Sequence, residues 1–268
     1  MKKKMILVLD IDGTLTNSQK EISARTKDAI EGAMERGHIV MLASGRPTAG
    51  MRRYENELEL KKYGGYLLSF NGGRIINCAT EKVVFQRTLP SDVIPKIYDY
   101  AMSHNLGIIT YQDDSIIMGS KGDQYIDIES RINAMPVKPV SNFLEYVDFD
   151  VNKCLLTGDP KIAEVCVDEL QEMFPDLSIM RSEPFFIEVM PKGIDKAQSL
   201  DRMLESLGLH RENTVCCGDG YNDISMIEYA GVGVAMGNAQ DAVKKVADFI
   251  TLSNDEDGLV VVIEKFIP

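Results

Sequence analysis

Short apolar runs alternate with amphipathic stretches along the first part of the chain. Met5–Leu9, Ile39–Ala43 and Tyr66–Phe70 are too short for helices and rich in apolar residues, so each run predicts a strand buried on both faces. Between the first two, apolar residues recur at helical spacing over 22–34, and Gly37 follows where a helix terminator is expected. This order of strand, helix and strand predicts a parallel α/β sheet.

The pattern changes near residue 86. Alternating residues around a turn predict a hairpin over 74–86, and the segments beyond it lack clustered polar residues at their strand ends. We expect helices at 91–105, 123–135 and 161–174, and strands at 108–111, 116–118, 152–157 and 177–181. The chain is therefore predicted to carry an inserted α/β domain at 86–186, with a core domain formed by 1–85 and 187–268.

The first pattern resumes after the predicted insertion. Phe185–Val189 and Thr214–Cys217 are expected to be strands, with an amphipathic helix between them from Ile194 to Leu207. Further helices are expected at 222–229, 239–247 and 259–266, and further strands at 232–236 and 249–251. The complete pattern predicts a Rossmann-like doubly wound parallel sheet as the core.

Two carboxylates follow the first predicted strand. Asp10 and Asp12 are two residues apart, so they face the same side of an extended chain until Gly13 turns it. Like charges this close cost energy unless a cation lies between them or one group keeps its proton. A calcium loop of the EF-hand type is excluded, because its glycine occupies the sixth position and a helix precedes it.

Other strand ends carry complementary groups. Ser44-Gly45-Arg46 follows the second strand and offers a hydroxyl, accessible backbone N–H groups and a guanidinium to an anion, although this stretch is also typical of an ordinary turn into a helix. Lys196 precedes an apolar helix, and Asp219 and Asp223 follow the strand at 214–217. The ends of parallel strands converge at one edge of a sheet. Carboxylates without histidine or cysteine partners suit Mg²⁺, and a lysine with a serine suits a phosphate group.

Composition narrows the classes of function. The chain has 268 residues, is 44% hydrophobic and 26% charged, and carries a net charge of −12, which argues against nucleic acid as a partner. The basic residues Lys2–Lys4 resemble the start of a signal peptide, but the apolar run ends at Asp10 without a cleavage site, and no run is long enough to span a membrane. The sequence also lacks a Walker A motif and the spacing of a dinucleotide fingerprint.

Cysteine usage indicates the compartment. Five cysteines, an odd number, are scattered through a chain large enough to fold without disulfides: Cys78, Cys154, Cys166, Cys216 and Cys217. We interpret them as reduced core residues, in the adjacent pair as elsewhere, because His38, His104 and His210 are isolated from them in sequence. The expected location is the cytoplasm, and the oligomeric state stays open between monomer and homodimer.

Taken together, these motifs resemble those of a known family. Asp10–Thr14, Ser44–Arg46, Lys196 and Gly218–Asp223 are similar to motifs one to four of the haloacid dehalogenase (HAD) superfamily. The long insertion resembles the large α/β cap of its Cof-type phosphatases, with a cap of type IIB. Ile11 stands where leucine is commoner in the family, and Ser44 stands where threonine is frequent. Lys192 competes for the position of the motif-three lysine, but the spacing of Lys196 from Asp219 fits the family better.

The resemblance implies roles for the acidic residues. Asp10 is the expected nucleophile, and Asp12 the expected general acid and base, with a pKa raised by neighbouring carboxylates. Asp10, Asp219 and the backbone carbonyl of Asp12 are expected to hold Mg²⁺. Asp223 is expected nearby, either in direct contact with the metal or through water.

The resemblance also implies a phosphate site. Ser44 and Lys196 are expected to bind the transferring phosphoryl group, with backbone groups of Gly45 beside them. Asn222 is expected to position Lys196 or the phosphate, and Arg46 to contact the substrate. The inserted cap is expected to close over the site and select the substrate, with Asp113, Asp114 and the segment 121–125 as candidates.

The function implied is Mg²⁺-dependent hydrolysis of phosphate monoesters of small metabolites through an aspartyl-phosphate. Sugar phosphates are the first candidates, followed by flavin mononucleotide and pyridoxal phosphate. A phosphomutase or phosphotransferase of the same superfamily is one alternative, although the Gly218–Asp223 motif favours the phosphatases. A non-catalytic protein that binds phosphorylated metabolites is the other.

Overall fold

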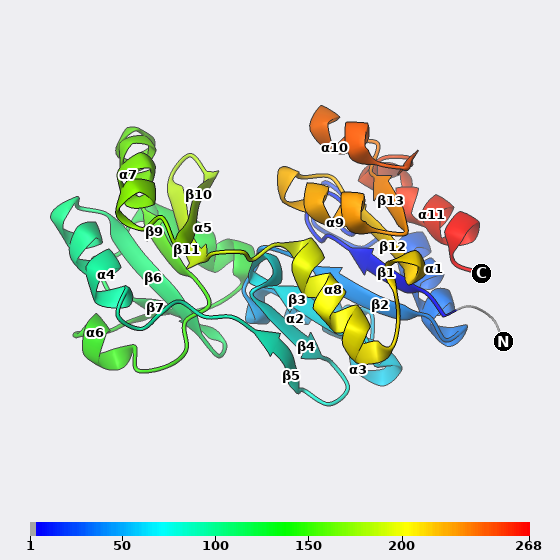
Figure 1. Cartoon of the computed structure of the whole chain (residues 1–268), viewed down its shortest axis with the longest axis horizontal. Helices are drawn as coiled ribbons and strands as arrows, with labels where there is room; N and C mark the ends of the chain where they lie inside the picture. Colours follow the sequence, from blue (N-terminus) through cyan, green and yellow to red (C-terminus); the bar gives the residue numbers. More distant parts are fainter. Residues whose placement is uncertain (1–3) are drawn as a thin grey trace. The chain divides into compact units, whose positions relative to one another are not determined.

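The computed structural model describes residues 4–268, so Lys2 and Lys3 of the basic run lie outside the described residues (Figure 1). Its contacts divide the chain into two compact units. The first unit contains the residues up to Phe85 together with Asp195–Pro268, and the second contains Gln86–Ile194. Each unit has its own sheet and its own apolar core.

The sheet of the first unit has eight strands among the described residues, in the order β14-β13-β12-β1-β2-β3-β4-β5. The strands are β1 (Ile6–Leu9), β2 (Ile39–Ala43), β3 (Tyr66–Ser69), β4 (Arg74–Asn77), β5 (Val83–Gln86), β12 (Thr214–Gly218), β13 (Val232–Ala235) and β14 (Phe249–Ile250). Strands from β14 to β3 pair in parallel, and β4 pairs with β3 in antiparallel orientation. The prediction of an α/β fold with a parallel core sheet is confirmed.

The α-helices of this unit are α1 (Ala24–Glu35), α2 (Thr48–Glu57), α3 (Leu60–Tyr63), α8 (Lys196–Leu207), α9 (Ile224–Tyr229), α10 (Asp241–Val246) and α11 (Gly258–Phe266). Helices α1, α2, α3, α9 and α10 lie between parallel strands of this sheet, whereas α8 precedes β12 and α11 follows β14. From β1 the chain moves through α1 to β2, whereas from β12 it moves through α9 to β13 on the other side. Because such crossovers are right-handed, the two directions place helices on opposite faces. Accordingly α1 packs against α11, while α8 and α10 pack against α9.

β1 lies at the point where the strand order reverses. It pairs with β2 on one edge and with β12 on the other, and Val8 lies opposite both Met41 and Cys216. All four residues of β1 are buried, as the apolar run predicts. Ligands of open α/β sheets bind beyond the carboxyl ends of the strands at such a reversal. The residues that follow β1, β2 and β12 therefore lie where a ligand of such a sheet binds.

The second unit has a six-stranded sheet in the order β10-β11-β9-β6-β7-β8. Its strands are β6 (Gly107–Gln112), β7 (Ser115–Met118), β8 (Val137–Pro139), β9 (Cys154–Thr157), β10 (Leu177–Glu183) and β11 (Phe186–Pro191). Its helices are α4 (Ile94–Ser103), α5 (Gln124–Asn133), α6 (Phe143–Tyr146) and α7 (Pro160–Met173). The apolar core includes Ile187 and Val189 of β11. Glu188 between them faces the other side, where it accepts a hydrogen bond of 2.8 Å from buried Lys153.

One strand belongs to a different sheet from the one predicted. The apolar run Phe185–Val189 was expected to rejoin the core, but β11 pairs with β9 and β10 in the second unit. The second boundary consequently falls after Ile194 and not after residue 186, whereas the boundary after Phe85 coincides with the predicted one. Burial on both faces predicts a strand, but it does not identify the strand's neighbours. The short elements α3, α6 and β8 were not predicted individually.

Within residues 4–268, no helix combines the length and the apolar character that crossing a bilayer requires. All five cysteines are buried free thiols, as expected.

Candidate active site

Asp10 is the first residue beyond β1. Its backbone N–H donates to the carbonyl oxygen of Cys217 at 3.0 Å, which extends the pairing of β1 with β12 by one residue. The carboxylate is buried, and its Oδ1 accepts a hydrogen bond of 2.6 Å from the Nζ of Lys196. The end of the central strand therefore holds a carboxylate in contact with a lysine from a distant part of the chain.

Asp219 follows β12, the neighbouring strand. The hydroxyl of Thr14 donates to its Oδ1 at 2.7 Å, and Gly13 lies against its carboxylate. Gly13 has a φ of +86°, and a β-carbon at this position would be 2.4 Å from the Oδ2 of Asp219. Glycine is thus required here for two reasons, its left-handed backbone and the closeness of the second aspartate.

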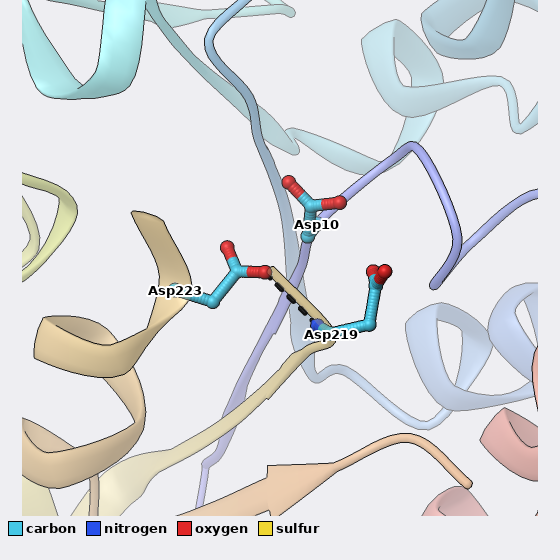
Figure 2. Close-up of side chains that lie close together, drawn as sticks. All are labelled: Asp10, Asp219 and Asp223. Carbon is cyan, nitrogen blue, oxygen red and sulfur yellow. Dashed lines mark hydrogen bonds between the residues drawn. The ribbon is translucent and has the colours of Figure 1, made fainter. Parts of the chain in front are cut away.

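Asp223 stabilises the turn that carries Asp219. Its Oδ2 accepts hydrogen bonds from the backbone N–H groups of Asp219 and Gly220, both at 2.9 Å, and its Oδ1 accepts one from Lys196 at 2.6 Å. The side chain is fully buried. Figure 2 shows Asp10, Asp219 and Asp223 around one region, and one carboxylate oxygen of each lies within 4.8 Å of the others. The three predicted metal-binding carboxylates are therefore brought together.

Lys196 is the first residue of α8, whose N-terminus is capped by the side chain of Asp195. Its Nζ donates to Asp10, to Asp223 and, at 3.0 Å, to the backbone oxygen of Ala43, the last residue of β2. Burial alone would lower the pKa of this lysine, but the charges of Asp10 and Asp223 outweigh burial and raise it. Lys196 is therefore cationic. Lys196 comes from the start of a helix, whereas the strand that precedes it in the chain, β11, belongs to the second unit.

The carboxylates carry more negative charge than Lys196 neutralises. The pKa of Asp10 lies well above its usual value because of burial and then the charge of Asp223, despite the opposing effect of Lys196. Burial is also the main cause that raises the pKa of Asp219 to about 6. Carboxylates that are this unfavourable as anions fit a cation, and oxygen-only donors fit Mg²⁺. Asp10 and Asp219 suit direct contact best, because both oxygens of Asp223 already accept hydrogen bonds.

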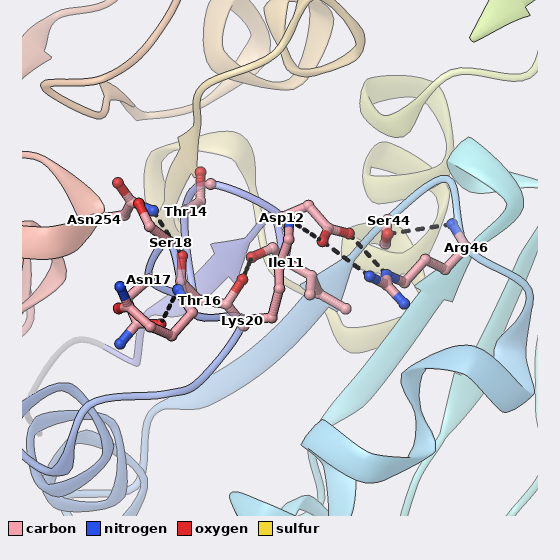
Figure 3. Close-up of polar contacts among 12 residues, drawn as sticks. Ile11, Asp12, Thr14, Thr16, Asn17, Ser18, Lys20, Ser44, Arg46 and Asn254 are labelled. Atoms are coloured by element: carbon pink, nitrogen blue, oxygen red, sulfur yellow. Dashed lines mark hydrogen bonds and ion pairs between the residues drawn. The ribbon is translucent and has the colours of Figure 1, made fainter. Parts of the chain in front are cut away.

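Asp12 points to a different set of partners. Its Oδ2 accepts from the Nε of Arg46 at 2.7 Å, and its Oδ1 accepts from an Nη of Arg46 at 2.9 Å and from Lys20 at 3.0 Å (Figure 3). Burial acts to raise the pKa of Asp12, but these cationic donors prevail and lower it to about 2. The expectation of a raised pKa at Asp12 is wrong for this structure. Sequence placed Asp12 beside carboxylates, whereas the fold places it between two cations.

The turn after β2 carries Ser44, Gly45 and Arg46. The hydroxyl of Ser44 is buried and accepts from the backbone N–H of Arg46 at 3.2 Å. Gly45 lies against the side chain of Asn71, whose own backbone has a φ of +55°. Asn222 donates to the Oδ1 of Asn71 at 3.1 Å, so its contact is with the loop after β3. Asn222 was expected to position Lys196 or the phosphate, and that role stays a prediction.

Other candidates lie elsewhere. Lys192, the competitor of Lys196, is exposed in the second unit, and its Nζ donates to the backbone oxygen of Pro175 at 2.8 Å. Asp113, Asp114 and the segment 121–125 also belong to the second unit, and their part in substrate selection stays a prediction.

Three contacts of the site were missed by sequence reasoning. Thr14 holds Asp219, Lys20 contacts Asp12, and Asn71 contacts Asn222. Thr14 lies inside the Asp10–Thr14 motif, so its proximity to the carboxylates was a usable signal. Asn71 directly follows the predicted strand at 66–70, so its place at a strand end was also a usable signal. Lys20 carried no such signal, because its contact depends on a loop that folds back onto the site.

The fold and this geometry define a class of protein, an α/β protein with clustered carboxylates and a buried lysine at the carboxyl ends of its parallel strands. A family model described as haloacid dehalogenase-like hydrolase matches residues 7–263, and the chain belongs to that family. The predicted resemblance is confirmed, and so is the prediction of a phosphoric monoester hydrolase.

Particular relatives resemble the chain along its length. It is 32% identical over 262 residues to the 5-amino-6-(5-phospho-D-ribitylamino)uracil phosphatase YcsE of Bacillus subtilis, covering 98% of this chain and 95% of that protein. A haloacid dehalogenase-like hydrolase from Bacteroides thetaiotaomicron has a similar crystal structure, with 45% identity, a TM-score of 0.95 and coverage of 98% and 99%. The HAD subclass IIB sugar phosphatase BT4131 is 27% identical, with a TM-score of 0.83 and coverage of 98% and 99%.

Proposed function

We propose that this chain is a Mg²⁺-dependent phosphatase of small phosphorylated metabolites, which acts through an aspartyl-phosphate on Asp10. The observation that carries the proposal is the contact of Lys196 with both Asp10 and Asp223, beside Asp219. A buried cation and a cluster of carboxylates that lacks neutralising charge together suit a phosphoryl group and a divalent metal. Asp10, Asp219 and the backbone carbonyl of Asp12 would hold the metal, which would offset the charge of the phosphoryl oxygens when bound.

The chain's own residues supply the remaining chemistry. A carboxylate oxygen of Asp10 attacks phosphorus, the bond between phosphorus and the ester oxygen breaks, and the leaving alcohol takes a proton from Asp12. Because its contacts with Arg46 and Lys20 lower the pKa of Asp12 to about 2, Asp12 has to leave these contacts and bind a proton before it can act as this acid. In the second step Asp12 takes a proton from water, whose oxygen attacks phosphorus and releases inorganic phosphate and free Asp10. Lys196 and Ser44 bind the transferring group and stabilise its charge. Gly45 adds a backbone N–H beside them.

The relatives narrow the substrates to be tested. One is named as a sugar phosphatase, and another as a phosphatase of a phosphorylated ribitylaminouracil. Both names describe phosphate esters of polyhydroxylated carbon chains, so sugar phosphates come first for this chain, followed by ribityl phosphates such as flavin mononucleotide. Comparing kcat/KM across a panel of phosphorylated metabolites would rank them.

The buried free thiols accord with the predicted cytoplasmic location.

The proposal is tested with p-nitrophenyl phosphate. We expect hydrolysis with Mg²⁺, loss of activity with EDTA, recovery when Mg²⁺ is restored, and loss of at least a hundredfold in Asp10→Asn. Asp28→Asn is the matched control, because Asp28 is exposed on α1 of the same unit. Acid quenching during turnover should trap phosphate on the wild-type protein and not on Asp10→Asn. Activity that persists in Asp10→Asn would overturn the assignment of the nucleophile.

A further inference from the structure

The turn from Asp10 to Thr16 carries two of the proposed metal-binding groups, a carboxylate and a backbone carbonyl. Part of it is held from within, because the N–H of Leu15 donates to the carbonyl oxygen of Asp10 at 3.1 Å, and the N–H of Thr16 donates to that of Ile11 at 3.0 Å. The carbonyl oxygens of Gly13 and Thr16 accept instead from side chains 225 and 238 positions away. The turn is therefore positioned in part by the other end of the chain.

Two asparagines supply these distant contacts. Asn238 lies in the loop after β13, and its Nδ2 donates to the carbonyl oxygen of Gly13 at 2.8 Å. Its Oδ1 accepts from the backbone N–H of Asn254 at 3.0 Å, and the Nδ2 of Asn254 donates to the carbonyl oxygen of Thr16 at 2.8 Å. One chain of hydrogen bonds thus runs from Gly13 to Thr16, and Figure 3 shows Asn254 beside this part of the turn.

The loop that contains Asn238 also contacts the turn after β12. The backbone N–H of Gln240 donates to the carbonyl oxygen of Asp219 at 3.1 Å. The loop therefore holds the turn after β1 through Gly13 and the turn after β12 through Asp219. These are the two turns that carry the proposed Mg²⁺ ligands.

The peptide that Asn238 contacts is the one that places Thr14. The carbonyl of Gly13 and the N–H of Thr14 belong to one planar peptide unit, so a hydrogen bond to its oxygen fixes the plane from which Thr14 extends. The hydroxyl of Thr14 donates to Oδ1 of Asp219 at 2.7 Å. Hydrogen-bond partners of this kind orient a carboxylate ligand of a metal, and their loss weakens metal binding.

We propose that Asn238 is a positioning residue for the Mg²⁺ site. It acts through the Gly13–Thr14 peptide on Asp219, and Asn254 supports it. This inference rests on the proposed function and extends it to two residues outside the four sequence motifs. Because every proposed ligand remains when Asn238 is replaced, the variant should keep the site and bind the metal more weakly.

The experiment measures the dissociation constant of Mg²⁺ by calorimetric titration of the full chain without substrate. For Asn238→Ala we expect a dissociation constant about tenfold above that of wild type. Asn254→Ala should cause a smaller increase, because its backbone N–H remains to hold Asn238. In phosphatase assays of Asn238→Ala, the Mg²⁺ concentration for half-maximal activity should rise by the same factor, while kcat at saturating Mg²⁺ should fall less.

Asn213 provides a matched control in the same unit. Its Nδ2 donates to the carbonyl oxygen of Lys4 at 3.0 Å, and its Oδ1 accepts from the backbone N–H of His210 at 3.1 Å. It bridges two backbone groups as Asn238 does, but it precedes β12 and so lies at the opposite end of the strand from the site. Asn213→Ala should lower the melting temperature about as much as Asn238→Ala, and its Mg²⁺ affinity should stay within about twofold of wild type.

Two further measurements test the route through Thr14. In a Thr14→Val background, Asn238→Ala should cause little additional loss of Mg²⁺ affinity, because the hydroxyl that holds Asp219 is already absent. In EDTA, the backbone amides of residues 14–16 should exchange hydrogen faster in Asn238→Ala than in wild type, and at the wild-type rate in Asn213→Ala.

The outcomes separate this inference from the proposed function. Absence of Mg²⁺ binding in the wild-type protein would contradict the proposed function, and this inference with it. Binding in the wild type with the same affinity in Asn238→Ala, or with equal losses in Asn238→Ala and Asn213→Ala, would overturn the role of Asn238 and leave the proposed function intact. Fully additive losses from Thr14→Val and Asn238→Ala would also overturn it, because the two residues would then act independently.

Discussion

The Nζ of Lys196 lies 2.6 Å from the Oδ1 of Asp10, although 186 positions separate the two residues. Both side chains are buried, with Lys196 1% and Asp10 8% exposed. One comes from the start of α8 and the other from the end of β1, so the packing of the helix against the sheet brings the cation to the carboxylate.

This relationship predicts a clear difference between two lysines. Lys196→Met should reduce phosphatase kcat/KM by at least a hundredfold, because the variant leaves three carboxylates without their buried cation. Lys192→Met should stay within about twofold of wild type, since Lys192 is exposed and contacts a backbone oxygen of the second unit. The measurement is the steady-state hydrolysis of p-nitrophenyl phosphate by both variants. Similar losses in the two variants would contradict the assignment of Lys196.

Asp223 is predicted to be a structural requirement of the turn as well as a partner of Lys196. Asp223→Ala removes a buried charge and the acceptor of two backbone N–H groups, so we expect a loss of about 3 kcal/mol in the free energy of unfolding. Asp28→Ala, at an exposed position of α1, should change it by less than about 0.5 kcal/mol. Urea denaturation followed by circular dichroism compares them. A loss below 1 kcal/mol in Asp223→Ala would show that the turn does not depend on this carboxylate.

Gly13 and Gly37 both have a positive φ, but only Gly13 lies against Asp219. Alanine variants at the two positions therefore distinguish the effect of backbone strain from the effect of displacing Asp219. Gly13 and Gly37 have φ values of +86° and +91°, but a β-carbon on Gly13 would be 2.4 Å from Asp219, whereas one on Gly37 has no heavy atom within 4 Å. Alanine at either position should cost roughly 1–2 kcal/mol of stability from backbone strain. Only Gly13→Ala should also weaken Mg²⁺ binding, which calorimetric titration measures. Equal Mg²⁺ affinities in the two variants would argue against Asp219 as a ligand.

The pKa of Asp219 predicts how the stability of the metal-free protein changes with pH. The pKa is about 6 in the folded protein and 3.8 as its ordinary value, so the folded state binds more protons between these pH values. The contribution of Asp219 to stability should therefore rise as pH falls from 6 towards 3.8. In EDTA, the melting temperature of wild type relative to Asp219→Asn should increase when pH is lowered from 7 to 5.

The same carboxylate predicts a pH dependence for the metal. Because Mg²⁺ needs ionised Asp219, added Mg²⁺ should raise the melting temperature of the wild-type protein more at pH 7 than at pH 5. Asp219→Asn should show a smaller increase at both pH values. An increase in wild type that is independent of pH would mean that Asp219 is ionised throughout this range or does not bind the metal.

Much of the site could be predicted because its residues are tied to local chain geometry. Asp10 comes directly after an apolar run that can only be a buried strand, and Asp219 after another such run. Parallel pairing of β1 with β12 then brings these two positions together without further information. The pKa of Asp12 could not be predicted in this way, because it depends on which cation reaches the carboxylate.

The sequence by itself determined the strands, the helix starts and the turn at Gly13. It also determined that carboxylates, a serine and a lysine follow these strands, as a phosphate and metal site at the sheet edge requires. These features follow from apolar periodicity and backbone preferences over a few residues. The tertiary structure alone decided that β11 pairs within the second unit, that Lys196 and not Lys192 reaches Asp10, and that Arg46 contacts Asp12. Such outcomes depend on distances between residues far apart in the chain, and a local pattern does not encode these distances.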